Sequence, residues 1–230
     1  NGDLTTFWNT YKQHHRVVLA DTAHEVRHRA VEDWWNTHTT GANAHLIAGT
    51  RSEAKLLNTL ARQRATTAGH LTGPVLTVRG KAFQVGDRIV LLRNMPGQHD
   101  LDTGRRCRVD NGMIGTITHI NHHHTDVDVE LGNGRHLRLD TEYVHGGNID
   151  HGYATTIHKA QGLTCDHIFV VGPAGLYREA GYVALSRARN TAHLYATTSD
   201  AAHVGERTHT TGIPLPTENI NDPEQDLITT

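Results

Sequence analysis

This 230-residue sequence is poor in the features that define several protein classes. It contains 2 cysteines, Cys107 and Cys165, which argues against a disulfide-stabilised scaffold and favours reduced thiols. No apolar run approaches the ~20 residues that a membrane-spanning helix needs. The first residues lack the basic stretch and apolar run of a signal peptide. These absences predict a cytoplasmic protein with no membrane partner.

Neither sign of charge dominates, because 22 Lys and Arg oppose 24 Asp and Glu. Any affinity for nucleic acid would therefore need a local basic patch. The 20 histidines are mostly scattered, and we interpret them as surface residues. His122, His123 and His124 are consecutive at a predicted hairpin tip, where a rigid metal frame is not expected, so surface residues are favoured over a zinc site.

Two motifs of phosphoryl-transfer enzymes are missing. No Gly-x-x-x-x-Gly-Lys-[Ser/Thr] occurs, since Gly80-Lys81 is followed by Ala82. No apolar run ends in Asp-Glu. Phosphoryl transfer needs a phosphate cradle, a metal carboxylate and a cation together, so we expect this chain alone not to catalyse it. No Ser/His/Asp or paired-carboxylate arrangement favours another hydrolase class.

Two β-α units are present near the start. Residues 17–20 are a predicted strand, and Thr22 with Glu25 forms a capping box for a helix. Residues 45–49 predict a second strand, and Ser52 is the expected N-cap of the next helix. Strand, turn and helix repeated twice indicate a parallel α/β fold. The apolar stripe of the second helix is predicted to be Leu56, Leu57, Leu60 and Ala61.

The pattern changes after Gly69. Glycines punctuate short predicted strands, with hairpin turns at Asn111-Gly112 and Asn133-Gly134. Such strands predict a small antiparallel barrel that ends near residue 149. The α/β pattern then returns with strands at 153–157, 167–171 and 192–197 and a helix at 176–189. Residues 199–230 are polar and are expected to form a tail.

Two features allow alternative interpretations. Trp34 fits the apolar stripe of the first helix, so core packing is favoured over a base-stacking platform. A basic cluster in the predicted barrel could follow a phosphate backbone or form a solvated loop face, and both remain open. The cluster comprises Arg88, Arg93, Arg105, Arg106 and Arg108.

The string Tyr153 to Thr164 contains Thr156-Ile-His-Lys-Ala-Gln-Gly162. It reads as the carboxyl end of a strand that opens into a helix start, which is where parallel α/β sheets bind ligands. Backbone N–H groups, Gly162 and Lys159 suit phosphate oxygens, and Gln161 can bond to phosphate or water. The alternative is an ordinary β-to-α turn with solvated polar residues.

The string Tyr182 to Arg189 is amphipathic and ends in Ser-Arg-Ala-Arg. The guanidinium of Arg187 could donate two hydrogen bonds to a γ-phosphate and would stay charged. Alone, this string is better explained as a solvated basic helix end. The functional interpretation gains support from the preceding string, because of the order of the two strings and the number of residues between them.

The two strings resemble motifs V and VI of superfamily 1 helicases, in the RecD-like form of conjugative relaxase-helicases. Residues 45–52 are similar to the motif IV region. Residues 85–94 and 110–116 resemble the SH3-like barrel that RecD-like helicases insert in their second motor domain. The resemblance implies a RecA-like parallel sheet domain in two parts, residues 1–78 and 150–198, with the barrel at 79–149 and the tail at 199–230.

The resemblance also implies roles for single residues. Arg187 would be the arginine finger, and Arg51 would face the γ-phosphate of ATP. Gln161 and Gly162 would line the nucleotide cleft. Single-stranded DNA would contact Thr156, His158 and Lys159.

The function implied is the C-terminal motor half of an ATP-dependent 5′→3′ DNA helicase. ATP and Mg²⁺ would be bound jointly with an N-terminal RecA-like domain of the same parent protein. The alternative is a non-catalytic module in which the barrel binds nucleic acid or protein.

Overall fold

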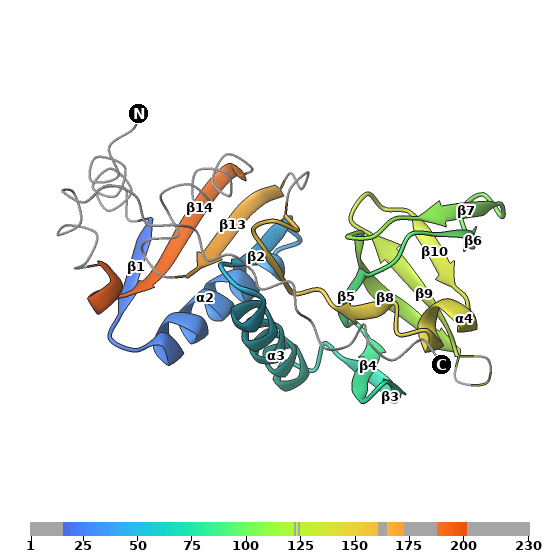
Figure 1. Cartoon of the computed structure of the whole chain (residues 1–230), viewed down its shortest axis with the longest axis horizontal. Coiled ribbons are helices and arrows are strands. Elements are labelled where there is room, and N and C mark those ends of the chain that lie inside the picture. Colours follow the sequence, from blue (N-terminus) through green and yellow to red (C-terminus); the bar gives the residue numbers. More distant parts are fainter. Residues whose placement is uncertain (1–15, 122, 124, 161–164, 173–187, 202–230) are drawn as a thin grey trace, which may run out of the picture.

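The computed structural model describes residues 16–121, 123, 125–160, 165–172 and 188–201. The chain forms a parallel α/β unit and an antiparallel β unit, which lie side by side (Figure 1). Over the described residues, no helix has the length and apolar character needed to cross a membrane.

The parallel unit is built on a five-stranded sheet in the order β1-β14-β13-β2-β12, and every pairing in it is parallel. Both predicted β-α units belong to it, so the α/β prediction is confirmed. Its strands are β1 (Val17–Ala20), β2 (Ala44–Ala48), β12 (Ala154–Thr156), β13 (Cys165–Val171) and β14 (Ala188–Thr197).

Helices α2 (Ala23–His38) and α3 (Arg51–Thr67) pack on one face of this sheet (Figure 1). The capping box of Thr22 and Glu25 on α2 is confirmed. The predicted N-cap of α3 is wrong, because Thr50 has the extended backbone and its Oγ1 accepts from the Glu53 N–H at 3.1 Å. The predicted stripe is corrected as well, since Leu56 is 46% exposed. The buried stripe of α3 is Ala54, Leu57, Ala61 and Ala65.

Trp34 fills the core between the helices and the sheet. Its side chain is fully buried, and its Nε1 donates to the Ala44 carbonyl at 3.2 Å. Burying the indole with its N–H paired avoids the cost of an unsatisfied donor. The core-packing interpretation of Trp34 is therefore confirmed. Large neighbours in this core include Leu46, Leu57, Phe169 and Tyr195.

The antiparallel unit contains a seven-stranded sheet in the order β11-β5-β8-β9-β10-β6-β7 and a separate β3-β4 hairpin. The terminal strands β11 and β7 are not paired with each other, so the sheet is open and a closed barrel is not confirmed. The elements are β3 (Thr72–Val78), β4 (Lys81–Val85), β5 (Arg88–Leu91), β6 (Met95–Asp100), β7 (Arg106–Val109), β8 (Ile114–Asn121), β9 (Asp126–Leu131), β10 (His136–Leu139), α4 (Thr141–His145) and β11 (Ile149–His151).

The last part of the chain differs from the predicted boundaries. Ala188 and Arg189 belong to β14, because the pairing of Ala188 with Cys165 extends the strand beyond the predicted start at residue 192. The remainder of the predicted helix, residues 176–187, lies outside the described residues. Strand β11 runs past residue 149 within the antiparallel sheet. The division of the chain at residues 78, 149 and 198 stays a prediction.

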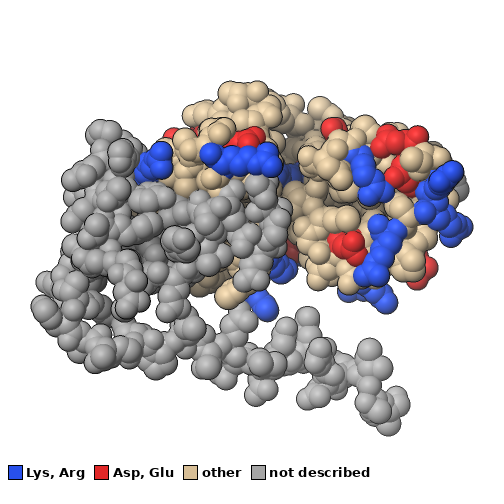
Figure 2. All heavy atoms as spheres, turned by 90° about the horizontal axis from the view of Figure 1, so that it is seen from above, with Lys and Arg blue, Asp and Glu red and all other residues tan. Residues whose placement is uncertain are grey.

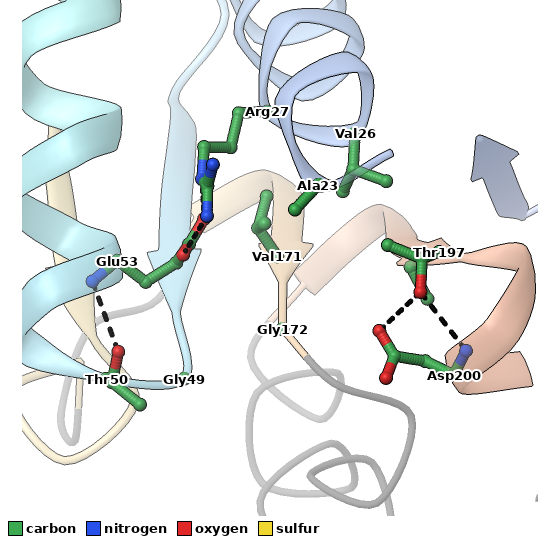
Figure 3. Close-up of a pocket in the computed structure, with 11 residues that line it drawn as sticks. Ala23, Val26, Arg27, Gly49, Thr50, Glu53, Val171, Gly172, Thr197 and Asp200 are labelled. Carbon is green, nitrogen blue, oxygen red and sulfur yellow. Dashed lines mark hydrogen bonds and ion pairs between the residues drawn. The ribbon is translucent and has the colours of Figure 1, made fainter. Parts of the chain in front are cut away.

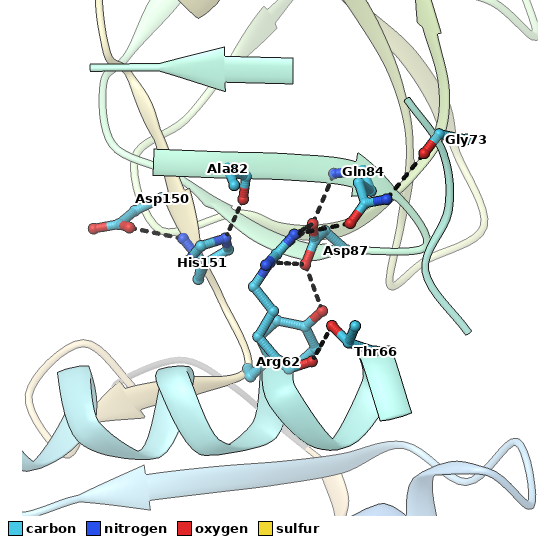
Figure 4. A network of polar contacts seen from close by, with 9 residues as sticks. Arg62, Thr66, Gly73, Ala82, Gln84, Asp87, Asp150 and His151 are labelled. Carbon is cyan, nitrogen blue, oxygen red and sulfur yellow. Dashed lines mark hydrogen bonds and ion pairs between the residues drawn. The ribbon is translucent and has the colours of Figure 1, made fainter. Parts of the chain in front are cut away.

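A buried carboxylate joins the two units (Figure 4). Asp87, immediately before β5, is fully buried and accepts from Arg62 of α3, whose Nε lies at 3.0 Å. The Gln84 N–H donates to Asp87 at 2.7 Å, and the Tyr153 hydroxyl donates at 2.7 Å. Burial and the Asp87 carboxylate raise the pKa of Tyr153, which stays a donor. Asp87 therefore links the antiparallel unit to both α3 and the segment that enters β12.

A second polar contact crosses the same junction. The Arg88 Nη2 lies 3.1 Å from His45 Nε2, and the Arg88 Nε is buried with no hydrogen-bond partner. Burial lowers the pKa of Arg88 to about 10. Burial, followed by the charge of Arg88, lowers the pKa of His45 to about 3 and that of His38 to about 4. Arg88 therefore lies at the junction between the two units rather than with the exposed members of the predicted basic cluster, and both interpretations of the cluster stay open for Arg93, Arg105 and Arg106.

Replacing Asp87 is expected to be strongly destabilising. Asp87→Ala leaves the Tyr153 hydroxyl without its acceptor and Arg62 with only the Gln84 Oε1 at 3.3 Å, so the free energy of unfolding should fall by about 3–5 kcal/mol. Urea unfolding followed by circular dichroism measures this loss. The matched control is Asp110→Ala, which breaks the exposed Arg108–Asp110 pair and should cost at most about 1 kcal/mol. Equal losses in the two variants would contradict the role of Asp87.

Stability is expected to fall as the pH is lowered from about 6.5 towards 4. The unfolded chain binds a proton at His45 near pH 6.5, whereas the folded chain resists it until about pH 3. The unfolded state then holds more protons, which costs the fold about 1.4 kcal/mol per pH unit for one such group. Between pH 7 and pH 5, the free energy of unfolding measured with urea should depend less steeply on pH in His45→Gln than in the wild-type chain. The control His24→Gln, at an exposed site on α2, should keep the full dependence.

Candidate functional site

A polar turn follows β12 at the carboxyl edge of the parallel sheet. Thr156 ends the strand opposite Ala48, and the Ile157 N–H donates to the Ala48 carbonyl at 3.2 Å. The Ala160 N–H then donates to the Thr156 carbonyl at 2.9 Å, and the Lys159 N–H donates to Thr156 Oγ1 at 3.4 Å. His158 and Lys159 are exposed. The predicted polar turn at a strand end is confirmed, and we name residues 156–159 the β12 turn.

Arg51 lies at the same edge. Strand β2 ends at Ala48, the Gly49 N–H donates to the Val171 carbonyl at 3.1 Å, and Arg51 opens α3 with its side chain exposed. Because β2 and β12 are parallel neighbours, their carboxyl ends lie together. The fold thus brings Arg51 and the β12 turn to one edge, although the ligand roles assigned to them stay predictions.

Several predicted site residues lie outside the described residues. These are Gln161, Gly162 and the expected arginine finger Arg187. His122 and His124 lie outside them too. Among the described residues, no three His, Cys, Asp or Glu side chains come together in a group that could hold a metal ion.

A cavity of about 230 Å³ opens at the same carboxyl edge, on the opposite flank of β2 from β12 (Figure 3). It lies between the carboxyl ends of β2, β13 and β14 and the amino ends of α2 and α3. Its lining is Ala23, Val26, Arg27, Gly49, Thr50, Glu53, Val171, Gly172, Ala196, Thr197 and Asp200.

The polar side chains of this cavity bond to one another (Figure 3). Arg27 binds Glu53 through two contacts, Nε–Oε1 at 2.7 Å and Nη2–Oε2 at 3.1 Å, and the Glu53 carboxylate raises the pKa of Arg27. Thr197 Oγ1 donates to Asp200 at 2.6 Å. Sequence reasoning missed these residues. Their positions in the sequence could have indicated them, because Arg27 lies one turn into a predicted helix and Thr197 ends a predicted strand.

Charge on the antiparallel unit is mixed. Basic and acidic side chains intersperse on the right of Figure 2. Arg108, a member of the predicted basic cluster, pairs with Asp110 at 2.8 Å. Arg93, Arg105 and Arg106 are exposed. Three of the five predicted cluster members therefore remain available to a phosphate backbone.

One protein family matches part of the chain. Residues 151–195 match the model of the UvrD-like helicase C-terminal domain. The match starts at the end of β11 and runs through the β12 turn, β13 and most of β14. It therefore includes the turn identified from the geometry of the sheet.

Curated proteins with similar sequences include conjugal transfer proteins. The chain is 31% identical over 189 residues to conjugal transfer protein TraA of Agrobacterium fabrum, which covers 80% of this chain and 16% of that protein. It is 30% identical over 197 residues to conjugal transfer protein TraA of Rhizobium radiobacter, covering 84% of this chain and 17% of that protein. The chain thus spans about a sixth of the length of these relatives. The family match and these relatives support a superfamily 1 helicase C-terminal domain.

Solved structures of Pif1 helicases resemble parts of the fold. The helicase from Candida albicans aligns with a TM-score of 0.44 and 17% identity, over 73% of this chain and 49% of that chain. The Bacteroides enzyme in complex with ADP-AlF3 and ssDNA aligns with a TM-score of 0.41 and 18% identity, over 66% of this chain and 40% of that chain.

Thr50, which precedes Arg51 and lines the cavity, is expected to anchor the amino end of α3. Thr50→Ala removes the acceptor for the Glu53 N–H and should lower the free energy of unfolding by about 1 kcal/mol. Ser52→Ala tests the rival N-cap: Ser52 lies inside the first turn, its Oγ lies 3.0 Å from Thr50 Oγ1 at an exposed site, and its loss should change stability by less than about 0.5 kcal/mol. Urea unfolding of both variants measures the difference. A larger loss for Ser52→Ala would restore Ser52 as the N-cap.

Proposed function

We propose that this chain, which carries a superfamily 1 helicase C-terminal domain, is the second motor half of an ATP-dependent DNA helicase. The observation that carries the proposal is the placement of Arg51 and the β12 turn at one carboxyl edge of a parallel sheet. The β12 turn also lies inside the segment that matches the helicase family model. A cationic side chain beside a turn with exposed His158 and Lys159 suits phosphate groups of a nucleotide or of DNA.

In this proposal, ATP binds between this domain and an N-terminal RecA-like domain of the parent protein. Arg51 faces the γ-phosphate, Gln161 and Gly162 line the cleft, and Arg187 stabilises charge in the transition state. Mg²⁺ would accompany ATP and be bound jointly with that N-terminal domain. No step of the reaction is assigned to a metal in this chain.

The same proposal places single-stranded DNA on the β12 turn. Lys159 supplies a positive charge to the phosphate backbone, and Thr156 and His158 supply side-chain contacts. Thr156 is half-buried at the strand end, so it has a fixed position from which to contact a strand. Closure of the two motor domains on ATP and their opening after hydrolysis would move them along the strand.

The finer features of the proposal come from the resemblance of the sequence to RecD-like superfamily 1 helicases. The parallel unit would be a RecA-like domain, and the antiparallel unit would be a divergent, open form of the SH3-like insertion. Movement would run 5′→3′, and the parent protein would be a conjugative relaxase-helicase. The relatives named conjugal transfer protein TraA support this parent class.

A second candidate is a binding module without motor function. The exposed Arg93, Arg105 and Arg106 of the antiparallel unit favour it, because they are cations at the surface of the described part of the chain. In that case a nucleic acid would bind the antiparallel unit and the β12 turn would not contribute. DNA binding by point variants separates the two candidates.

The chain alone is expected to show no DNA-dependent ATP hydrolysis, because its sequence lacks a phosphate-binding loop and a strand that ends in Asp-Glu. Phosphate release with and without single-stranded DNA measures this. In the parent protein, Arg187→Ala should lower kcat by at least about 10³-fold. Hydrolysis by the pure chain that Arg187→Ala abolishes would contradict the need for a partner domain.

Single-stranded DNA is expected to bind the chain through the β12 turn. Lys159→Ala should weaken binding of a fluorescein-labelled oligothymidylate and reduce the slope of log affinity against log salt by about one. Fluorescence anisotropy between about 50 and 200 mM salt measures both quantities. The control Lys55→Ala removes an exposed lysine of α3 and should leave both unchanged. If the double variant Arg105→Ala/Arg106→Ala abolishes binding while Lys159→Ala does not alter it, the binding module is favoured.

A further inference from the structure

Strand β12 is a short element with an unusual support on its outer side. It has three residues, Ala154–Thr156, and lies at the end of the parallel sheet. Strand β2 pairs with it on one side. A three-residue edge strand of this kind has few ladder hydrogen bonds and needs other contacts to stay in place.

Asn58 of α3 supplies those contacts on the outer side. Its Nδ2 donates to the Ala154 carbonyl at 2.9 Å, and its Oδ1 accepts from the Ala154 N–H at 3.0 Å. Its Nδ2 also donates to the Ala54 carbonyl of α3 at 2.9 Å. The amide therefore replaces the backbone of a neighbouring strand and ties β12 to the helix.

Tyr153 ties the start of β12 to the antiparallel unit. Its side chain is 3% exposed, and its hydroxyl donates to the buried Asp87. Asp87 is in turn bound by Arg62, one helical turn after Asn58 on α3. The same face of α3 thus fixes β12 directly through Asn58 and indirectly through Arg62 and Asp87.

The contacts at the start of β12 constrain the turn at its end. Tyr153 and Thr156 are three residues apart, which is about 10 Å of extended chain at roughly 3.3 Å per residue. An extended strand paired along its length transmits a displacement of one end to the other. The backbone contacts of the turn, from Ile157 to Ala48 and from Ala160 to Thr156, therefore depend on where Tyr153 lies.

We propose that Tyr153 and Asn58 are positioning residues for the β12 turn, and that Asp87 makes the position of this turn depend on the antiparallel unit. The consequence of this positioning is that a change in the antiparallel unit alters DNA binding at the β12 turn. That consequence rests on the proposed function. The positioning itself is a property of the fold and has a readout of its own.

Backbone hydrogen exchange of the whole chain tests the positioning by Tyr153. Tyr153→Phe removes the hydroxyl with little change in volume, so the amides of Ile157 and Ala160 should exchange about tenfold faster. The matched control is Tyr195→Phe, which removes another buried tyrosine hydroxyl that donates to a carboxylate, Asp33, at 2.6 Å. That control should lower stability without a selective change at residues 157–160. Equal exchange of these amides in the two variants overturns the positioning role.

Asn58 provides a second test that does not involve Asp87. Asn58→Ala removes both hydrogen bonds to Ala154 and should increase exchange at Ala154, Ile157 and Ala160 by about tenfold. The control Thr59→Ala changes the exposed neighbour on the same helix, whose Oγ1 donates to the Lys55 carbonyl. Exchange that is the same in both variants overturns the role of Asn58.

DNA binding tests the consequence. Tyr153→Phe should weaken binding of labelled oligothymidylate by about fivefold, whereas Tyr195→Phe should leave it unchanged. Unchanged affinity in Tyr153→Phe, when the wild-type chain binds, overturns the link between positioning and binding. A wild-type chain that does not bind contradicts the proposed function, and the exchange experiment still decides the positioning by itself.

Discussion

The carboxylate of Asp87 is the contact on which the arrangement of the two units depends. It is fully buried and receives donors from α3, from β4 and from Tyr153. A buried charge is tolerated only when it is paired and its oxygens are hydrogen-bonded. Gly86 enables this placement, because its φ of +94° suits glycine and an added Cβ would collide with the His70 carbonyl. The turn at Gly86 therefore places the Asp87 carboxylate within hydrogen-bond distance of Arg62, Gln84 and Tyr153.

The junction gives the candidate site its geometry. Helix α3 begins at Arg51, carries Asn58 against Ala154 and carries Arg62 against Asp87. The helix that presents Arg51 is thus the same helix that supports β12. Because Thr50 caps this helix directly after β2, the two neighbouring strand ends and the start of the helix form one connected unit. The cavity between α2 and α3 is stabilised by its own ion pair and is separated from the β12 turn by β2.

Local patterns in the sequence predicted much of the parallel unit. The capping box at Thr22 depends on residues three apart, and the polar turn at Thr156 depends on a strand that ends in polar residues. The N-cap of α3 was predicted two residues late, since Thr50 and Ser52 are both suitable types and only the backbone at Thr50 decides between them. Leu56 was assigned to the core because its type suits burial, although its angular position on α3 faces solvent.

The sequence by itself determined the α/β pattern, the antiparallel character of the middle segment, and the polar residues that follow β12. These follow from hydrophobic periodicity and from turn residues, which are local properties. Only the tertiary structure decided that Arg88 lies against His45, that Asn58 supports the outer side of β12, and that Asp87 joins Arg62 to Tyr153. These contacts join residues 25 to 96 positions apart, so they depend on strand order and helix packing rather than on any local pattern.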